Sequence, residues 1–154
     1  MYTQSLNNNA IELSGLVLVY PMLSYDTHKP SYMKYNDINR FLSHSQMNWF
    51  WNLYLGDELM VNACKTLYTV CPSITPPAII MNYPRTIFIQ AKYDILLDEG
   101  IDFYNLLLEY NVTADIQIHN DSVHGFFGHN NMSNAYKLYS NFIKNQFDLM
   151  MLDD

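Results

Sequence analysis

Residues 86–100 read TIFIQAKYDILLDEG. The run Thr86–Ala91 at the start of this stretch is mostly apolar and rich in residues that favour β-structure, which predicts a strand. Asp94 and Asp98 flank the turn that follows, and apolar residues then recur at helical spacing up to Tyr110. The acidic side chains stand at the start of this helix, where the helix dipole favours them. The stretch therefore predicts a strand, a turn and a helix in direct succession.

Two further strands are predicted, one on each side of this unit. Upstream, Leu16–Tyr20 is a continuous apolar, β-branched and aromatic run closed by Pro21, which is typical of a strand buried on both faces. Downstream, Ala114–His119 alternates as a strand does, and Met132–Met151 is predicted to be a final amphipathic helix. Strands that alternate with helices indicate an α/β fold. We expect one domain over residues 1–154, with about three parallel strands, right-handed crossovers and flanking helices.

The segment between the first two strands is predicted to be a long loop followed by helices. Ser24–Arg40 is rich in polar and turn-forming residues and is predicted to be a loop. Ser43 offers an N-cap to an amphipathic helix that Gly56 ends, and Asp57–Val70 is a weaker helical stretch before a proline cluster. The apolar positions of the first helix are Met47, Phe50, Trp51, Tyr54 and Leu55.

Composition bounds the classes of partner. Of the 154 residues 49% are hydrophobic, and 15 acidic against 8 basic side chains give a net charge of -7. A nucleic-acid partner is not expected from this charge, and no glycine-rich phosphate loop follows any predicted strand. The apolar run Gly15–Leu23 is shorter than the roughly 20 residues that cross a bilayer, so we expect a soluble chain whose compartment stays open.

Metal ions and cofactors are not expected. Cys64 and Cys71 match no zinc or redox motif and make no disulfide framework, so we expect two buried thiols. His124 and His129, with Asp121, have the side chains of a metal site. The glycines between the two histidines indicate a loop, which puts no helical face behind such a site.

The carboxyl ends of the predicted strands direct attention to two residues. Ligands of parallel sheets bind beyond these ends, where Asp94 follows the second strand and His124 follows the third. A carboxylate that accepts from one imidazole nitrogen leaves the other nitrogen free to take a proton from a nucleophile. The simpler alternatives are that Asp94 caps the following helix and that His124 is a turn residue packed beside Phe126 and Phe127.

The same residues carry a resemblance to a known family. Tyr20–Pro21, Pro72, Tyr93–Gly100 and His124–Phe126 resemble the carboxyl-terminal half of hormone-sensitive-lipase-like α/β-hydrolases, over about Gly15 to Phe127. The motif Asp-Pro-Leu-Arg-Asp-Glu-Gly of that branch is altered here, with Ile95 for the proline and Leu97 for the arginine. Shorter pieces resemble arylacetamide deacetylases: Pro30–Tyr32, Leu42–Ser43, and Phe50–Trp51 with Tyr54.

The resemblance implies roles for four acidic and basic side chains. Asp94 would be the acid and His124 the base of a catalytic triad, while Asp98 and Glu99 would be structural. The complete enzyme would act on a small apolar ester or amide. Part of the helix that carries Phe50, Trp51 and Tyr54 would line an acyl or alcohol pocket, although these aromatic residues are as simply explained as core. The resemblance leaves a cytoplasmic and an endoplasmic-reticulum-associated protein both open.

Two motifs of the family are absent. The sequence contains neither a Gly-x-Ser-x-Gly nucleophile elbow nor a His-Gly-Gly oxyanion stretch. Ser122 and Ser5 are poor substitutes, because no glycine-rich elbow or preceding strand supports them. We therefore expect a polar lead over residues 1–14 and a portion without the nucleophile-bearing half, inactive alone. The alternative is a non-catalytic pseudoenzyme or interaction module.

A missing half also has a physical consequence for the first strand. In the family the strand equivalent to Leu16–Tyr20 pairs with a strand of the other half, so one edge would be exposed and apolar here. We expect self-association, or pairing with an amino-terminal partner, through this strand.

Overall fold

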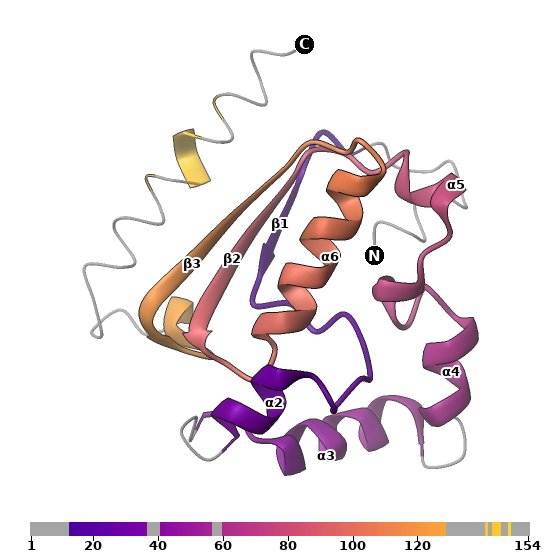
Figure 1. The fold of residues 1–154 in the computed structure, drawn as a ribbon, viewed down its shortest axis with the longest axis vertical. Helices are drawn as coiled ribbons and strands as arrows, with labels where there is room; N and C mark the ends of the chain where they lie inside the picture. Colours follow the sequence, from indigo (N-terminus) through magenta and orange to yellow (C-terminus); the bar gives the residue numbers. More distant parts are fainter. Residues whose placement is uncertain are drawn as a thin grey trace.

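Three parallel strands form the central sheet of the chain (Figure 1). The computed structural model describes residues 13–36, 41–56 and 60–128, together with residues 141, 143–145 and 148. Within these ranges β1 (Leu16–Val19), β2 (Thr86–Tyr93) and β3 (Ala114–Val123) stand in the order β1-β2-β3. The α/β class with three parallel strands is therefore confirmed.

The central strand β2 is covered on both faces. Leu16 lies opposite Thr86, which in turn lies opposite Ala114, so the three strands start in register. Alternate side chains of β2 leave the sheet on opposite sides. Ile87 and Ile89 pack with Phe126 on one side, in a cluster that also holds Ala91. This two-sided burial explains why the first six residues of β2 are all buried and mostly apolar.

Helix α6 (Leu97–Glu109) covers the other face of the sheet (Figure 1). Phe103 and Leu107 of this helix pack with Phe88 of β2 in one buried cluster. Gly100 lies against the buried side chain of Gln90, and a Cβ atom at this position would overlap the Gln90 amide. The glycine therefore permits a close approach of helix to strand.

The segment between β1 and β2 is helical. Its elements are α2 (Pro30–Tyr35), α3 (His44–Leu55), α4 (Met60–Thr66), the 3-10 turn Pro72–Ile74 and α5 (Pro77–Ile80). Helix α3 lies beyond one end of the sheet and α5 lies near the other (Figure 1). Ser43 and Gln46 form a reciprocal capping box at the start of α3, and Gly56 ends the helix at a φ of 73°. The cap and the stop predicted for this helix are confirmed.

Two predicted element boundaries are wrong in part. The predicted loop Ser24–Arg40 contains α2, because Tyr32 and Tyr35 are buried and fix one short helical stretch against the core. The third strand continues past His119 to Val123, and a register shift between Ala91 and Tyr93 accommodates the longer pairing. The polar residues of the extension did not suggest a strand: Asn120 and Asp121 are exposed, and the buried Ser122 is satisfied by His119.

The expectation of two free thiols is also wrong. Cys64 of α4 and Cys71 are joined in a disulfide, with Cα atoms 5.0 Å apart. The chain reverses after α4, where the amides of Val70 and Cys71 both donate to the carbonyl oxygen of Leu67. This turn brings together two cysteines whose spacing in the sequence matches no known motif.

Two further expectations are a final helix near the end of the chain and the absence of a membrane-spanning segment. Most of the predicted helix Met132–Met151 lies outside the described residues, although residues 141, 143–145 and 148 are helical. In the parts of the chain that the structure describes, no helix has both the length and the hydrophobicity to span a bilayer.

Candidate active site

The ends of two neighbouring strands bring Asp94 and His124 together. Tyr93 of β2 is paired with Val123 of β3, so the next residue of each strand leaves the sheet at the same rim. The Nδ1 atom of His124 lies 2.7 Å from Oδ2 of Asp94, within hydrogen-bonding distance. Asp94 is fully buried, whereas the His124 side chain is 23% exposed. This is the contact that the strand order predicts; the catalytic roles of the two residues remain predictions.

Asp94 uses both carboxylate oxygens. While Oδ2 accepts from the His124 ring, Oδ1 accepts from the backbone amide of Leu96 at 2.9 Å. The simpler alternative, an aspartate that supports the turn before α6, is therefore present together with the imidazole contact. The Leu96 amide fixes the rotation of the carboxylate and so the direction in which it holds the imidazole.

The pairing assigns the proton of the imidazole. Because an ionised carboxylate only accepts hydrogen bonds, Nδ1 of His124 carries the proton and donates it to Asp94. Nε2 then keeps its lone pair and can take a proton from a neighbouring hydroxyl group.

A pocket of about 550 Å³ opens beside His124, within the size range of small-molecule sites. Its walls come from the end of β1 and the residues that follow it, from α3, and from the turns that follow β2 and β3. The lining residues are Val19, Tyr20, Pro21, Met22, Leu42, Met47, Phe50, Tyr54, Leu96 and His124. Apart from His124, none of these carries an ionisable charge near neutral pH, so the pocket favours an apolar ligand.

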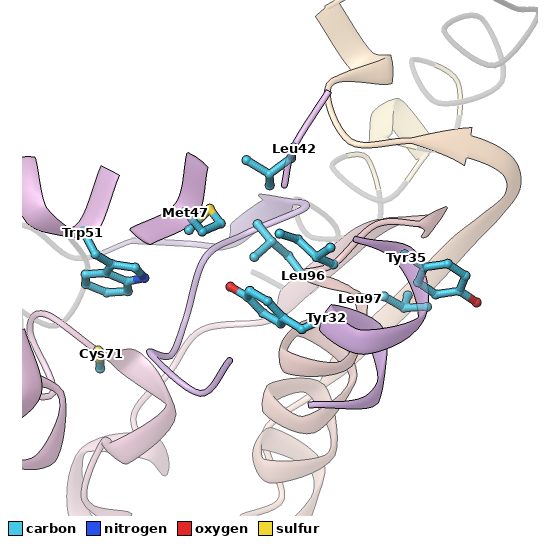
Figure 2. Close-up of a cluster of buried hydrophobic side chains, with 9 residues drawn as sticks. Tyr32, Tyr35, Leu42, Met47, Trp51, Cys71, Leu96 and Leu97 are labelled. Carbon is cyan, nitrogen blue, oxygen red and sulfur yellow. The ribbon is translucent and has the colours of Figure 1, made fainter. Parts of the chain in front are cut away.

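The aromatic set of α3 divides between the core and the pocket. Trp51 is fully buried in the cluster that Figure 2 shows, beside Tyr32 and Met47. Phe50 and Tyr54 are exposed and line the pocket instead. The core explanation therefore applies to Trp51, while an acyl or alcohol pocket beside Phe50 and Tyr54 remains a prediction.

Asp98 and Glu99 do not line the pocket, but they bind the segment that follows β1. Oε2 of Glu99 accepts from the amides of Leu23 and Ser24, at 3.1 and 2.7 Å, and from the Ser24 hydroxyl at 2.9 Å. Oδ2 of Asp98 accepts from the amide of Ser31 at 2.6 Å. The start of α6 therefore anchors the loop that follows β1, which is the structural role that the resemblance implies for these residues.

The environment of Glu99 shifts its ionisation. Its side chain is 1% exposed, and burial raises the pKa of the carboxyl to about 7, against the opposing effect of the hydrogen bonds from Leu23 and Ser24. Oε1 has no hydrogen-bond partner in the described part of the chain. Reasoning from the sequence missed the partners of this group, because no local pattern links Glu99 to residues 75 or more positions away.

Among the alternative catalytic residues, Ser122 pairs with a histidine other than His124. The Ser122 hydroxyl lies 2.6 Å from Nδ1 of His119, and Ser122 is buried. Ser5 and His129 lie outside the described residues. Among the residues that the structure describes, no three histidine, cysteine, aspartate or glutamate side chains gather as a metal site would require.

Asp94→Asn is expected to move the His124 proton from Nδ1 to Nε2. Asparagine has one acceptor oxygen, which the buried Leu96 amide retains, so the side-chain NH₂ group faces the imidazole and requires an acceptor there. The ¹⁵N chemical shifts of the ring, measured where the imidazole is neutral, report which nitrogen carries the proton. Asp98→Asn is the matched control, since Asp98 also accepts from a backbone amide but does not contact His124. A proton that stays on Nδ1 in Asp94→Asn would contradict the assignment.

Comparison with known proteins agrees with this architecture. Residues 1–128 match the sequence model of a family described as having the alpha/beta hydrolase fold. A curated relative, the vegetative-specific protein H5 of Dictyostelium discoideum, is 27% identical over 123 residues, which cover 79% of this chain and 35% of the relative.

Solved structures with this fold include two esterases. A thermostable esterase from Pseudomonas putida is similar with a TM-score of 0.73 and 23% identity, over 80% of this chain and 37% of that one. A fungal esterase from Rhizomucor miehei has a TM-score of 0.82 and 19% identity, over 99% of this chain and 47% of that one. The chain spans about a third to a half of the length of these relatives.

Proposed function

Since the chain belongs to the family with the α/β-hydrolase fold, we propose that it carries the acid and the base of a carboxylic-ester hydrolase site. The observation that supports this proposal is the hydrogen bond between Asp94 and His124 at the wall of an apolar pocket. In the proposed reaction a serine hydroxyl attacks the ester carbonyl while Nε2 of His124 takes its proton. His124 then gives this proton to the departing alcohol, and Asp94 orients the ring throughout.

The pocket favours a small, uncharged substrate with an aromatic or branched apolar group. Tyr20, Phe50 and Tyr54 give the wall three aromatic rings, and Met47 and Leu96 complete it with adaptable apolar side chains. Among the described residues, no lysine or arginine lines the pocket to pair with a substrate carboxylate. We propose an aryl or short-chain ester or amide, as arylacetamide deacetylases would take.

The attacking serine is proposed to come from a segment that pairs with β1. The sequence has no Gly-x-Ser-x-Gly motif, and no strand in the described ranges pairs with the outer edge of β1. All four residues of β1 are only half-buried. A parallel strand on this edge would bury them and place its own carboxyl end at the rim that carries His124.

The substrate class is tested by binding to the purified chain. Ethyl phenylacetate, a neutral aryl ester, is expected to shift the amide resonances of His124 and α3, whereas succinate is expected to leave them unchanged. Phe50→Asp should abolish the shifts, because a carboxylate in the apolar wall disfavours the ester. Leu53→Asp, at an exposed position of the same helix that is absent from the pocket lining, is the control. Equal effects of the ester and succinate would contradict the proposed substrate class.

The need for a separate nucleophile is tested by turnover. The chain alone is expected to hydrolyse p-nitrophenyl butyrate no faster than His124→Ala, since loss of a serine nucleophile lowers turnover by about a millionfold. Saturable turnover that His124→Ala abolishes would show that the chain holds a nucleophile of its own.

A non-catalytic interaction module is the second candidate, which the absence of a nucleophile elbow favours. It shares the edge of β1 that no strand in the described ranges covers, and we propose that the chain self-associates or binds an amino-terminal partner through this edge. Val17→Lys is expected to reduce self-association in light scattering, because a charged side chain on an edge strand opposes pairing. A wild-type chain that is monomeric at high concentration would contradict self-association.

A further inference from the structure

Tyr20 has a backbone conformation that aromatic residues rarely adopt. Among the described residues other than glycine, Tyr20 and Asn111 alone have positive φ angles, of 34° and 60°. Asparagine tolerates this region, whereas a bulky side chain is disfavoured there. Tyr20 also precedes Pro21, and its amide donates to the carbonyl oxygen of Ile89 at 2.7 Å. A glycine would relieve the backbone, so the strained tyrosine indicates that its side chain is used.

The side chain of Tyr20 contacts three residues of the turn that carries His124. Its ring centroid lies 4.5 Å from that of His124, at an interplanar angle of 57°. The edge of the ring meets Phe126 at 5.6 Å. The phenol oxygen accepts a hydrogen bond from the backbone amide of Phe127, and burial raises the pKa of the phenol, which stays neutral.

These contacts restrain the imidazole where Asp94 does not. A single hydrogen bond at Nδ1 leaves the His124 ring free to swing about that contact, whereas a ring packed against its face limits the swing. The bond to Phe127 joins the end of β1 to the turn after β3, across the intervening strand β2.

We propose that Tyr20 is a positioning residue that holds the imidazole of His124 in the orientation required for proton transfer. The proposal rests on the proposed function of His124 as a base and assigns Tyr20 no chemical step of its own. The aromatic ring sets the orientation of the imidazole, and the phenol oxygen tethers the turn.

The two contributions are separated by two substitutions at Tyr20. Tyr20→Phe keeps the ring and removes the oxygen, while Tyr20→Leu removes both. Tyr104→Leu is the matched control, because Tyr104 also packs against an aromatic residue, Phe88, but in the cluster under α6. In each variant the ¹⁵N shifts of the His124 ring report the tautomer, and hydrogen exchange reports the Phe127 amide.

In Tyr20→Leu we expect the imidazole to swing away from Asp94 and so to lose the acceptor that holds the proton on Nδ1. The ring shifts should then average between the Nδ1–H and Nε2–H forms. Tyr20→Phe should restore the wild-type tautomer but raise exchange of the Phe127 amide by about fivefold, as expected when one hydrogen bond is lost. Tyr104→Leu should change neither signal.

A wild-type tautomer in folded Tyr20→Leu would overturn the role of the ring. Unchanged Phe127 exchange in Tyr20→Phe would overturn the tether, and this second variant serves if the first does not fold. Both signals are measured without substrate, so failure of the proposed ester binding or turnover is seen separately.

Discussion

Replacing Trp51 with alanine is expected to lower the free energy of unfolding by about 3–5 kcal/mol. Trp51 is fully buried, and its ring meets Tyr25 edge-on at 5.6 Å. It lies in the cluster that joins α2 and α3 to the start of α6 (Figure 2). Removal of the indole leaves a cavity that these elements cannot close without moving, so both stability and the pocket wall on α3 should be lost.

The other tryptophan of the sequence provides the control for this substitution. Trp49 lies two positions away on α3 and is 57% exposed. Trp49→Ala should change stability by less than about 0.5 kcal/mol. Trp51→Phe should cost less than Trp51→Ala, because it retains a buried ring and removes an indole N–H that has no hydrogen-bond partner among the described residues. Urea unfolding followed by circular dichroism measures these differences, and equal losses at the two tryptophans would contradict the assignment.

Glu99→Gln is expected to remove a large part of the pH dependence of stability. Burial raises the folded-state pKa of Glu99 from 4.5 to about 7, so the folded chain binds this proton more tightly than the unfolded chain does. The proton on Glu99 stabilises the folded chain fully below pH 4.5, and this stabilisation is lost as the pH rises to about 7. At about 1.4 kcal/mol per pH unit, the wild-type chain should lose about 3 kcal/mol across this window.

The uncharged variant does not titrate in this window. Its oxygen can still accept from the amides of Leu23 and Ser24, and any cost of burying its NH₂ group is the same at every pH. The free energy of unfolding of Glu99→Gln relative to the wild type should therefore increase from pH 4.5 to pH 8. Glu109→Gln, an exposed substitution at the end of α6, should show no such trend. Parallel pH profiles for Glu99→Gln and the wild type would show that burial does not shift this carboxyl.

Much of the candidate site could be predicted because it depends on strand order. The apolar runs that became β1 and β2 are local patterns, and parallel strands joined by a helix place their carboxyl ends at one rim. The contact between Asp94 and His124 could therefore be predicted without knowledge of their side-chain angles. The anchor of the loop after β1 on Glu99 could not be predicted in the same way, since it depends on how α6 packs.

The failed predictions share a physical cause. Helix α2 has six residues, too few for a hydrophobic period to be recognised, and it is held by the burial of Tyr32 and Tyr35. The bond between Cys64 and Cys71 depends on a turn that no motif marks. In both cases contacts across the fold outweigh weak local preferences.

By itself, the sequence determined the strand and helix order, the boundaries of α3 and the rim at which an acid and an imidazole meet, because each follows from local periodicity, capping and chain direction. Only the tertiary structure decided that Trp51 enters the core while Phe50 and Tyr54 line the pocket, and that Tyr20 packs on His124. These outcomes depend on the space left between elements far apart in the chain, which no local pattern records.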